Sequence, residues 1–520
     1  MELLSQVAHG FSVALLPANV FAALLGCLMG TVIGVLPGIG PATTISLLLP
    51  VTYAMSPVAA LIMVAGIYYG AMYGGSTTSV LVNIPGEAAS VVTCLDGYQM
   101  ALKGRAGPAL GMCAFASFIA VTIGVVGLML VAPLLASVAL QFGPPEYVVL
   151  IAIGLLLAPT LATGSKVKGL IMVVVGLLLG AVGMDPVTGY PRFTFETTYL
   201  LGGIDVVVVI IGLFGVTEVL ANLARPAAAT VLSSFSSRLA DLMPNRQDWR
   251  ESKGAIARGS LLGFFIGLLP GGGAITAPLV AYAVEKKVSK MPEQFGAGAI
   301  AGVAAPEAAN NSAATAAFVP LLTLGIPFNA VTALMMTALM IHGVRPSPLL
   351  MQQHPEIFWG VIASMYLGNA MLLALNLPLV GIFVQLLRIP YPILFPLILL
   401  FAAVGAYSLN NSVQDVFAMI GFGMAGYLLQ KAGFEPAPLV LALVLGPMLE
   451  SAFRQSLILS HGSFAIFVSR PVSGSMVVLA AVFLFASLAL KLVQRRRRLW
   501  GGILIGRGRP AESAGRGTGA

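Results

Sequence analysis

Long apolar segments with almost no charge dominate this chain, and they restrict its possible folds more than any other feature. Windows of about twenty apolar residues follow one another along most of its length, and each is long enough to cross a bilayer as a helix. Only 9% of the 520 residues are charged, whereas a soluble globular protein is usually about 25% charged. A soluble chain of this length could not solvate its surface with so few charges. The sequence therefore predicts an integral membrane protein with many crossings, most of whose surface faces lipid.

The net charge of +8 comes almost entirely from the C-terminal tail. From Lys491 onward, eight basic residues stand against a single acid, Glu512. Basic residues that follow an apolar segment are retained in the cytoplasm, near anionic lipid. We therefore expect a disordered, cytoplasmic basic tail at 494–520. Because no folded basic domain accompanies it, we expect no nucleic-acid partner.

An internal repeat divides the apolar part of the chain into two similar halves. Residues 30–43 read GTVIGVLPGIGPAT and residues 263–276 read GFFIGLLPGGGAIT, and the two blocks align without a gap. A second pair of similar motifs follows the blocks, with NIPG at 83–86 and GIPF at 325–328. We call this pair the second echo of the repeat. Internal repeats of this kind indicate duplication and are common in secondary transporters.

These features predict an all-α polytopic membrane protein. It would contain two internal repeats with broken or re-entrant helices and about 10–13 transmembrane crossings. The first membrane repeat covers 1–223, and a polar segment with five basic residues, 224–257, is predicted as a cytoplasmic connector. The second repeat, with extra C-terminal spans, covers 258–493, and the basic tail follows it.

The Pro-Gly core of each block is expected to interrupt a membrane helix. Proline removes a backbone donor and glycine permits non-helical dihedral angles, which a bilayer tolerates only inside protein or beside water. Each block would end one half-helix and begin another, whose free N–H groups and positive dipole end favour an anion. The same glycines could instead serve close helix packing. The substrate-binding residues predicted here are Gly38, Gly40, Thr43, Thr44, Gly271, Gly273 and Thr276.

Beside each block lies a polar run that a membrane helix would otherwise avoid. Hydroxyl groups can donate to carboxylate oxygens and can also ligate a cation such as sodium, and amides can do the same. The residues of these runs predicted to bind substrate are Ser76, Thr77, Thr78, Asn83, Asn310 and Asn311. Those predicted to take part in ion coupling are Ser79, Glu307 and Ser312.

Glu307 is unusual because it lies in an alanine-rich segment with no basic residue nearby in the sequence. A carboxylate inside a membrane is costly unless it is paired, protonated or ligated, so such a residue is a functional candidate by default. Alternatively, Glu307 could occupy the first turn of a helix that begins at Pro306, where the helix dipole would stabilise it. On one helix, Asn310 and Asn311 would share its face and could form a polar cluster with it.

The sequence offers no motif for enzymatic chemistry. It contains no Gly-x-x-x-x-Gly-Lys-Ser/Thr loop for ATP, no His-Glu-x-x-His zinc pair and no Gly-x-Ser-x-Gly nucleophile elbow. We therefore expect neither an enzyme nor a resident cofactor or metal. The only ion expected is Na+ or H+ as a coupling ion.

Four groups of residues resemble the large membrane subunit of the tripartite tricarboxylate transporters, the TctA family. They are the paired Pro-Gly blocks, YGAMYGGSTT at 69–78, IPGE at 84–87 and APEAANN at 305–311. The resemblance covers roughly residues 15–490 and implies a multi-pass protein of the bacterial inner membrane. It implies two protein partners, a small membrane subunit and a periplasmic solute-binding protein. It also implies small organic anions, often di- or tricarboxylates, as substrates.

The sequence thus favours an ion-gradient-driven, binding-protein-dependent secondary transporter that takes up small organic anions. The alternative is a carboxylate or ion channel, or a membrane scaffold subunit that does not itself transport. A channel should show a continuous polar stripe through several spans, whereas polarity here is concentrated at the breaks within the chain.

Overall fold

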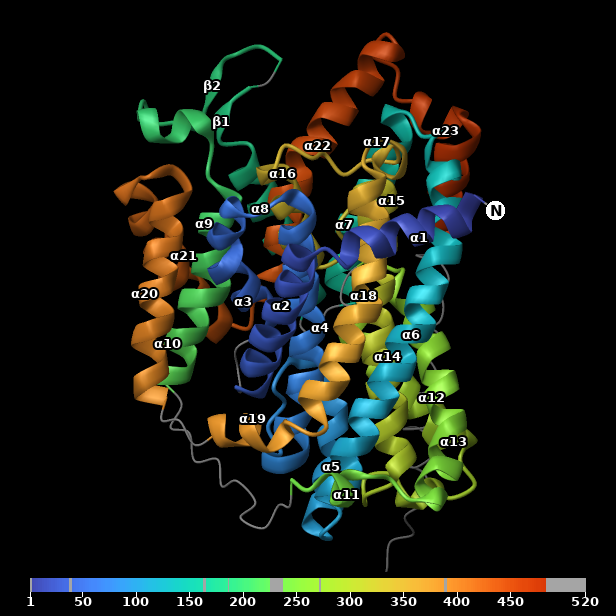
Figure 1. The fold of residues 1–520 in the computed structure, drawn as a ribbon. Coiled ribbons are helices and arrows are strands. Elements are labelled where there is room, and N and C mark those ends of the chain that lie inside the picture. The colour runs from blue at the N-terminus through green and yellow to red at the C-terminus, as the bar shows by residue number, and fades with distance from the viewer. Residues whose placement is uncertain are drawn as a thin grey trace, which may run out of the picture. The chain divides into compact units, whose positions relative to one another are not determined.

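The computed structural model describes residues 2–36, 40–161, 165–185, 187–224, 237–270, 273–387 and 391–482. These residues are helical almost throughout, and they include one short two-stranded antiparallel sheet (Figure 1). The chain divides into a larger unit, Met1–Gln141 with Gly154–Ser451, and a smaller one, Phe142–Ile153 with Ala452–Ala520. Within the smaller unit, Arg470 Nε donates to Glu146 Oε1 (2.7 Å) and so joins its two segments.

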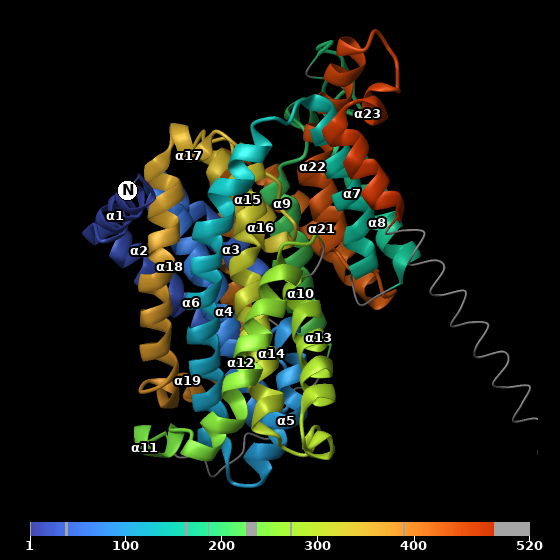
Figure 2. The ribbon, with the colours of Figure 1, turned by 90° about the vertical axis from the view of Figure 1, so that its right-hand side faces the viewer.

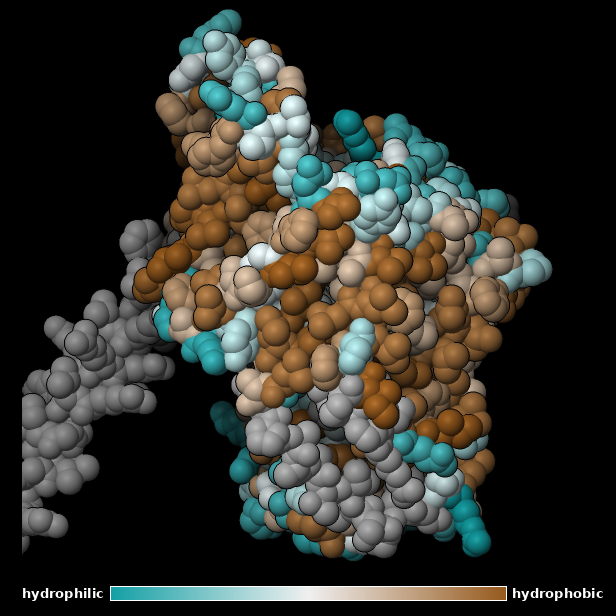
Figure 3. All heavy atoms as spheres, turned by 90° about the vertical axis from the view of Figure 1, so that its left-hand side faces the viewer, coloured by the Kyte–Doolittle hydropathy of each residue, from teal (hydrophilic) through white to brown (hydrophobic). Residues whose placement is uncertain are grey.

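Six helical segments among the described residues are long and apolar enough to cross a membrane. They are α2 (Pro17–Val35), α4 (Pro57–Val82), α6 (Ala106–Ala139), Val206–Leu223, α18 (Pro355–Asn376) and α22 (Ala437–Leu459). Shorter apolar helices lie at Pro144–Leu157, Ala330–Ile341, Phe395–Asn410 and Pro471–Val482. On the face of the larger unit seen in Figure 3, hydrophobic residues form a broad zone between hydrophilic ends. The predicted all-α polytopic membrane fold is therefore confirmed.

The remaining elements connect or flank these segments. Val206–Leu223 consists of α9 (Val206–Ile210), a π-helical turn η4 (Ile211–Val216) and α10 (Thr217–Leu223). In the first half the others are α1 (Glu2–Ala14), α3 (Pro41–Leu48), η1 (Leu49–Ala54), η2 (Ala88–Ser90), α5 (Val91–Leu102), α7 (Pro144–Leu161), α8 (Lys166–Gly180), β1 (Gly183–Met184), β2 (Pro191–Arg192) and η3 (Thr198–Gly202). In the second half they are α11 (Leu239–Leu242), α12 (Arg246–Gly267), α13 (Gly273–Val288), η5 (Pro292–Gln294), α14 (Ile300–Ala316), α15 (Phe318–Leu324), α16 (Ala330–Ile341), α17 (Leu350–Gln353), α19 (Val380–Leu386), α20 (Tyr391–Asn410), α21 (Val413–Lys431) and α23 (Ile466–Ser469).

Both Pro-Gly blocks interrupt helices, as the sequence predicts. Helix α2 ends at Val35 and α3 begins at Pro41, while α12 ends at Gly267 and α13 begins at Gly273. Helices α12 and α13 form a hairpin that packs on α14, and its open end lies beside α5 and α11 (Figure 2). Helices α2 and α3 both pack on α4, and α2 begins near α1 (Figure 1).

We refer to α2–α3 and α12–α13 as the two hairpins. Matching glycines bring each of them into close contact with its neighbouring helix. A Cβ atom built on any of them would lie no more than 2.5 Å from a backbone carbonyl oxygen of the facing helix. Small residues allow such close backbone approach in membrane helices. The glycines of α2 face Met63, Ile67 and Ala71 of α4, and those of α12 face Ala305, Ala309 and Ala313 of α14. The glycines are Gly26, Gly30 and Gly34 in the first repeat and Gly259, Gly263 and Gly267 in the second.

The last part of the predicted polar connector is helical. Helix α12 begins at Arg246, because Asn245 caps it by accepting from the backbone N–H groups of Gln247 and Asp248. The last part of the predicted connector 224–257 is therefore the first half of a helix. Residues 225–236 and the predicted basic tail 494–520 lie outside the described residues.

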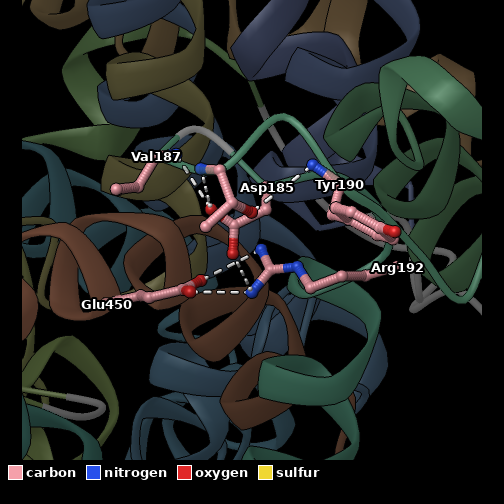
Figure 4. A network of polar contacts seen from close by, with 6 residues as sticks. Asp185, Val187, Tyr190, Arg192 and Glu450 are labelled. Atoms are coloured by element: carbon pink, nitrogen blue, oxygen red, sulfur yellow. Dashed lines mark hydrogen bonds and ion pairs between the residues drawn. The ribbon is translucent and has the colours of Figure 1, made fainter.

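A polar network secures the hairpin of β1 and β2 (Figure 4). Arg192 on β2 donates from Nη1 and Nη2 to the two carboxylate oxygens of Glu450, at 2.7 and 3.2 Å. Its Nη1 also lies 3.5 Å from Oδ2 of Asp185, whose Oδ1 accepts from the backbone N–H of Val187 (2.8 Å). The hydrogen bonds to Glu450 raise the pKa of the Arg192 guanidinium above its ordinary value. Arg192 therefore remains charged and ties the hairpin to α22.

Candidate functional site

A cavity of about 300 Å³ lies in the larger unit, where parts of both repeats meet. The first repeat contributes the start of α3 and the segment around Glu87, and the second contributes the starts of α13 and α16. Phe214 in the π-helical turn and Leu441 in α22 also line it. The cavity is of the size that holds a small ligand.

Three helix N-termini supply part of the cavity lining. The residues come from the first turns of their helices: Gly40 to Thr43 for α3, Ala274 and Ile275 for α13, and Ala330 and Val331 for α16. First-turn N–H groups have no partner within their own helix, and the helix dipole places partial positive charge there. Together these ends favour an anion in the cavity.

Two capping residues at matching positions of the repeats, Glu87 and Asn329, also line the cavity. Each follows the second echo of its repeat, in which Asn83 and Gly325 take the left-handed conformation at the end of a helix. Each forms a capping box. The Glu87 carboxylate accepts from the backbone N–H of Ala89 (3.1 Å), and the Asn329 side-chain oxygen accepts from that of Thr332 (2.8 Å). The two repeats therefore share this local structure but differ in charge.

The charged side chains that line the cavity are acidic. Glu87, Glu218 and Glu435 take part in the lining, and none of the described lining residues is basic. None of these three carboxyl groups is among the site residues predicted from the sequence. Glu87 lies within the IPGE motif, and its alignment with Asn329 in the second echo could have identified both residues. Glu218 could have been found as an isolated acid in an apolar span.

Glu307 lies outside the cavity lining, at the centre of a second buried cluster. Its side chain is fully buried in α14, and its Oε2 accepts from Ser76 Oγ (2.7 Å) and, at 3.5 Å, from Ser117 Oγ. Thr93 Oγ1 donates to the other carboxylate oxygen. Because α14 begins at Ile300, Glu307 lies well inside the helix, and the alternative of a first-turn residue after Pro306 is wrong.

Two neighbouring asparagines connect Glu307 with the cavity. Asn311 Nδ2 donates to Ser117 Oγ (2.8 Å) and to the backbone carbonyl of Glu307 (3.1 Å). Asn310 Nδ2 donates instead to Glu87 Oε1 (3.2 Å), so the two asparagines serve different carboxyl groups. Adjacent residues of α14 thus contact the cavity-lining Glu87 on one side and the Glu307 cluster on the other.

Several other predicted site residues use their hydroxyl groups for backbone contacts. Thr44 Oγ1 donates to the carbonyl of Gly40 (3.2 Å), and Thr78 Oγ1 to that of Val35 (2.7 Å). Ser79 Oγ donates to the carbonyls of Gly75 and Ser90, at 3.0 and 3.1 Å, and Ser312 Oγ to that of Ser260 (2.7 Å). Thr78, Ser79 and Ser312 thus join separate segments, whereas Thr44 bonds within the start of α3. All four lie outside the cavity lining.

The remaining predicted residues are distributed around the cavity. Gly40 and Thr43 line it, and Gly273 and Thr276 lie in the first turn of α13 beside residues that do. Thr77 lies on α4 in a smaller cavity next to Ser76. Asn83 is exposed at the end of α4. Gly38 and Gly271 lie outside the described residues.

Comparisons with known proteins agree with this architecture. The model of the tripartite tricarboxylate transporter TctA family matches residues 20–441. An "uncharacterized 52.8 kDa protein in TAR-I ttuC' 3'region" of Agrobacterium vitis is 48% identical over 500 residues, which cover 96% of this chain and 99% of that protein. An "uncharacterized protein in TAR-II ttuC' 3'region" of the same organism is 47% identical over 238 residues, 46% of this chain and 98% of that protein. No solved structure matches the chain. The chain therefore belongs to the TctA family of tripartite tricarboxylate transporters.

Proposed function

We propose that this protein is the large membrane subunit of an ion-gradient-driven transporter that takes up small organic anions, such as di- or tricarboxylates. It would work with a small membrane subunit and a periplasmic solute-binding protein. The observation that carries this proposal is the convergence of the α3, α13 and α16 N-termini on one cavity. Such ends can hold a carboxylate without a basic side chain.

The matching hairpins support alternating access around this cavity. We propose that they form an inverted repeat, with α2–α3 and α12–α13 entering from opposite sides of the bacterial inner membrane and meeting at the substrate. Many secondary transporters use broken helices in this way. Basic residues gather at the ends of α5, α12 and α13, and this distribution favours the cytoplasm for that side. They include Lys103, Arg105, Arg246, Arg250, Lys286 and Lys287.

Uptake into proteoliposomes tests the proposed function. The chain would be reconstituted with its two partners, and labelled succinate, malate and citrate would be added with and without an inward Na+ or H+ gradient. We expect accumulation of at least one carboxylate, and only when a gradient is imposed. Flux that merely equilibrates the label, irrespective of any gradient, would show a channel instead. Absence of flux for the whole panel would contradict carboxylate transport.

Glu87→Gln should separate substrate binding from coupling. Burial raises the pKa of the Glu87 carboxyl group to about 8, so above this pH its negative charge repels an anion in the same cavity, by about 1–2 kcal/mol for charges roughly 10 Å apart at an effective dielectric constant near 20. Removing this charge should tighten carboxylate binding about tenfold, while gradient-driven accumulation falls. Calorimetric titration and uptake would measure the two effects.

A matched control for Glu87→Gln is available at Glu356. This carboxylate pairs with His354, and both side chains are 42% exposed. Glu356→Gln should leave binding and uptake unchanged. Carboxylate affinity that is the same in Glu87→Gln as in the natural protein would show that Glu87 does not act on the substrate.

A further inference from the structure

A second, much smaller cavity lies beside Glu307. Its volume is about 10 Å³, close to the smallest that holds one water molecule. It is enclosed by α4, α6 and the end of α18, and none of its lining residues lines the large cavity. Its polar lining residues are Tyr73, Ser76, Thr77, Ser117 and Asn376.

The neighbouring Glu307 carboxylate has no basic partner among the described residues. Its hydrogen-bond donors there are the hydroxyls of Ser76, Thr93 and Ser117. Burial disfavours the ionised carboxylate, and the hydroxyl donors favour it over the acid. A buried ionised group is very costly unless a counter-charge compensates it. A cation beside Glu307 would therefore stabilise its ionised form.

Two amide oxygens beside Glu307 also lack a donor or a cation. The side-chain oxygens of Asn310 and Asn311 are buried and have no hydrogen-bond partner in the part of the chain that the structure describes. Buried polar atoms are nearly always satisfied, so an orphaned acceptor calls for a donor or a cation. The Asn311 amide donates to Ser117 Oγ (2.8 Å), and Ser117 lines the small cavity. The side-chain oxygen of Asn311 thus belongs to the same cluster as the Glu307 carboxylate.

We propose that the small cavity binds one Na+ ion, held by the Glu307 carboxylate and by the hydroxyl oxygens of Ser76 and Ser117, with Asn311 as a further ligand. Carboxylate, hydroxyl and amide oxygens are the ligands that hard cations take. A hydroxyl that donates to Glu307 keeps lone pairs for a metal ion. One carboxylate balances one monovalent charge, and a cavity the size of one water molecule favours Na+ over the larger K+.

This site also locates the coupling step, and that role rests on the proposed function. Ser76 connects the ion to α4. On α14 the adjacent Asn311 and Asn310 contact Glu307 and the cavity-lining Glu87 respectively. Na+ would therefore be the coupling ion. It would bind in place of the proton that the Glu307 carboxyl group could otherwise carry.

Thermal unfolding of the purified full chain tests Na+ binding without any substrate. NaCl, KCl and choline chloride would be compared at constant ionic strength and pH. Ligand that binds only the folded state raises Tm in a saturable manner. We expect this response for NaCl alone, with roughly tenfold weaker apparent affinity or no response in Ser117→Ala and Glu307→Gln. Ser364→Ala is the control, since its hydroxyl is also buried but donates to the backbone carbonyl of Val361 on α18.

Each outcome decides the proposal. Equal responses to NaCl and KCl, or a full Na+ response in both Ser117→Ala and Glu307→Gln, would overturn the site. Ser117→Ala leaves the charge in place, so it remains informative even where Glu307→Gln does not fold. Na+ binding without carboxylate uptake would contradict the transport function but not the site. Uptake driven by a pH gradient alone, in a chain that does not respond to Na+, would contradict the site but not the function.

Discussion

Replacing Gly40 by tryptophan should abolish carboxylate uptake while leaving the fold intact. Gly40 precedes α3 with an extended backbone, φ −78° and ψ 172°, which any residue can adopt. A Cβ atom built there has no heavy atom within 4 Å, because the residue lines the large cavity. An indole would therefore occupy the space of the substrate. We expect uptake to fall by roughly a hundredfold or more, since even small misplacement of a bound molecule can cost that factor.

The chain offers a matched control for this substitution at Gly421. This glycine of α21 is exposed, and a Cβ atom built on it also meets nothing within 4 Å, but it lies outside the cavity lining. Gly421→Trp should retain uptake, and Gly40→Ala should retain most of it because a methyl group leaves the cavity largely open. Size-exclusion chromatography would verify that all three variants fold. Normal uptake by a folded Gly40→Trp protein would rule out this cavity as the substrate site.

Gly263→Leu should instead destabilise the fold so strongly that little folded protein is obtained. A Cβ atom at this position of α12 would lie less than 3.0 Å from the backbone of Ala309 on α14, so the two helices would have to separate. Overpacking a well-packed contact costs about 1–3 kcal/mol or more, and the contact here is with backbone that cannot rotate away. We expect loss of the monodisperse species in detergent and a marked fall in Tm.

The equivalent glycine of the first repeat, Gly30, should behave in the same way. Its Cβ would meet the backbone of Ile67 on α4. Gly421→Leu is again the control and should unfold like the natural protein. If Gly263→Leu and Gly30→Leu both kept the natural Tm, the two glycine contacts would have no role in holding the hairpins.

The positions of the helix breaks could be predicted because their cause is local. Pro37 and Pro270 remove a backbone donor wherever they stand, so the ends of α2 and α12 follow from the sequence. The start of α12 was missed because residues 246–257 are polar and a hydropathy window cannot distinguish a polar helix from a loop. The capping box at Asn245 was the local evidence for it.

The partners of the polar residues could not be predicted, because they depend on which helices become neighbours. Ser76 and Ser79 lie three positions apart in one run of hydroxyls. Ser76 reaches Glu307 on α14, whereas Ser79 donates to the carbonyls of Gly75 in its own helix and of Ser90 in η2. A serine hydroxyl in a helix can donate to the backbone carbonyl one turn earlier, and this bond competes with contacts to other helices. The alignment of the second echo relates Glu87 to Asn329, but only the folded chain shows that both residues line one cavity.

The difference between Glu87 and Asn329 has a consequence for how a substrate can lie. A cavity built from two identical repeats would hold a ligand in two head-to-tail poses of equal energy. Here one capping position carries a carboxyl group and its counterpart carries a neutral amide. A molecule with unlike ends, such as one bearing a carboxylate and a hydroxyl, would be sorted into a single pose. Divergence at one pair of positions after duplication would thus be enough to give an ancestral symmetric cavity a polarity.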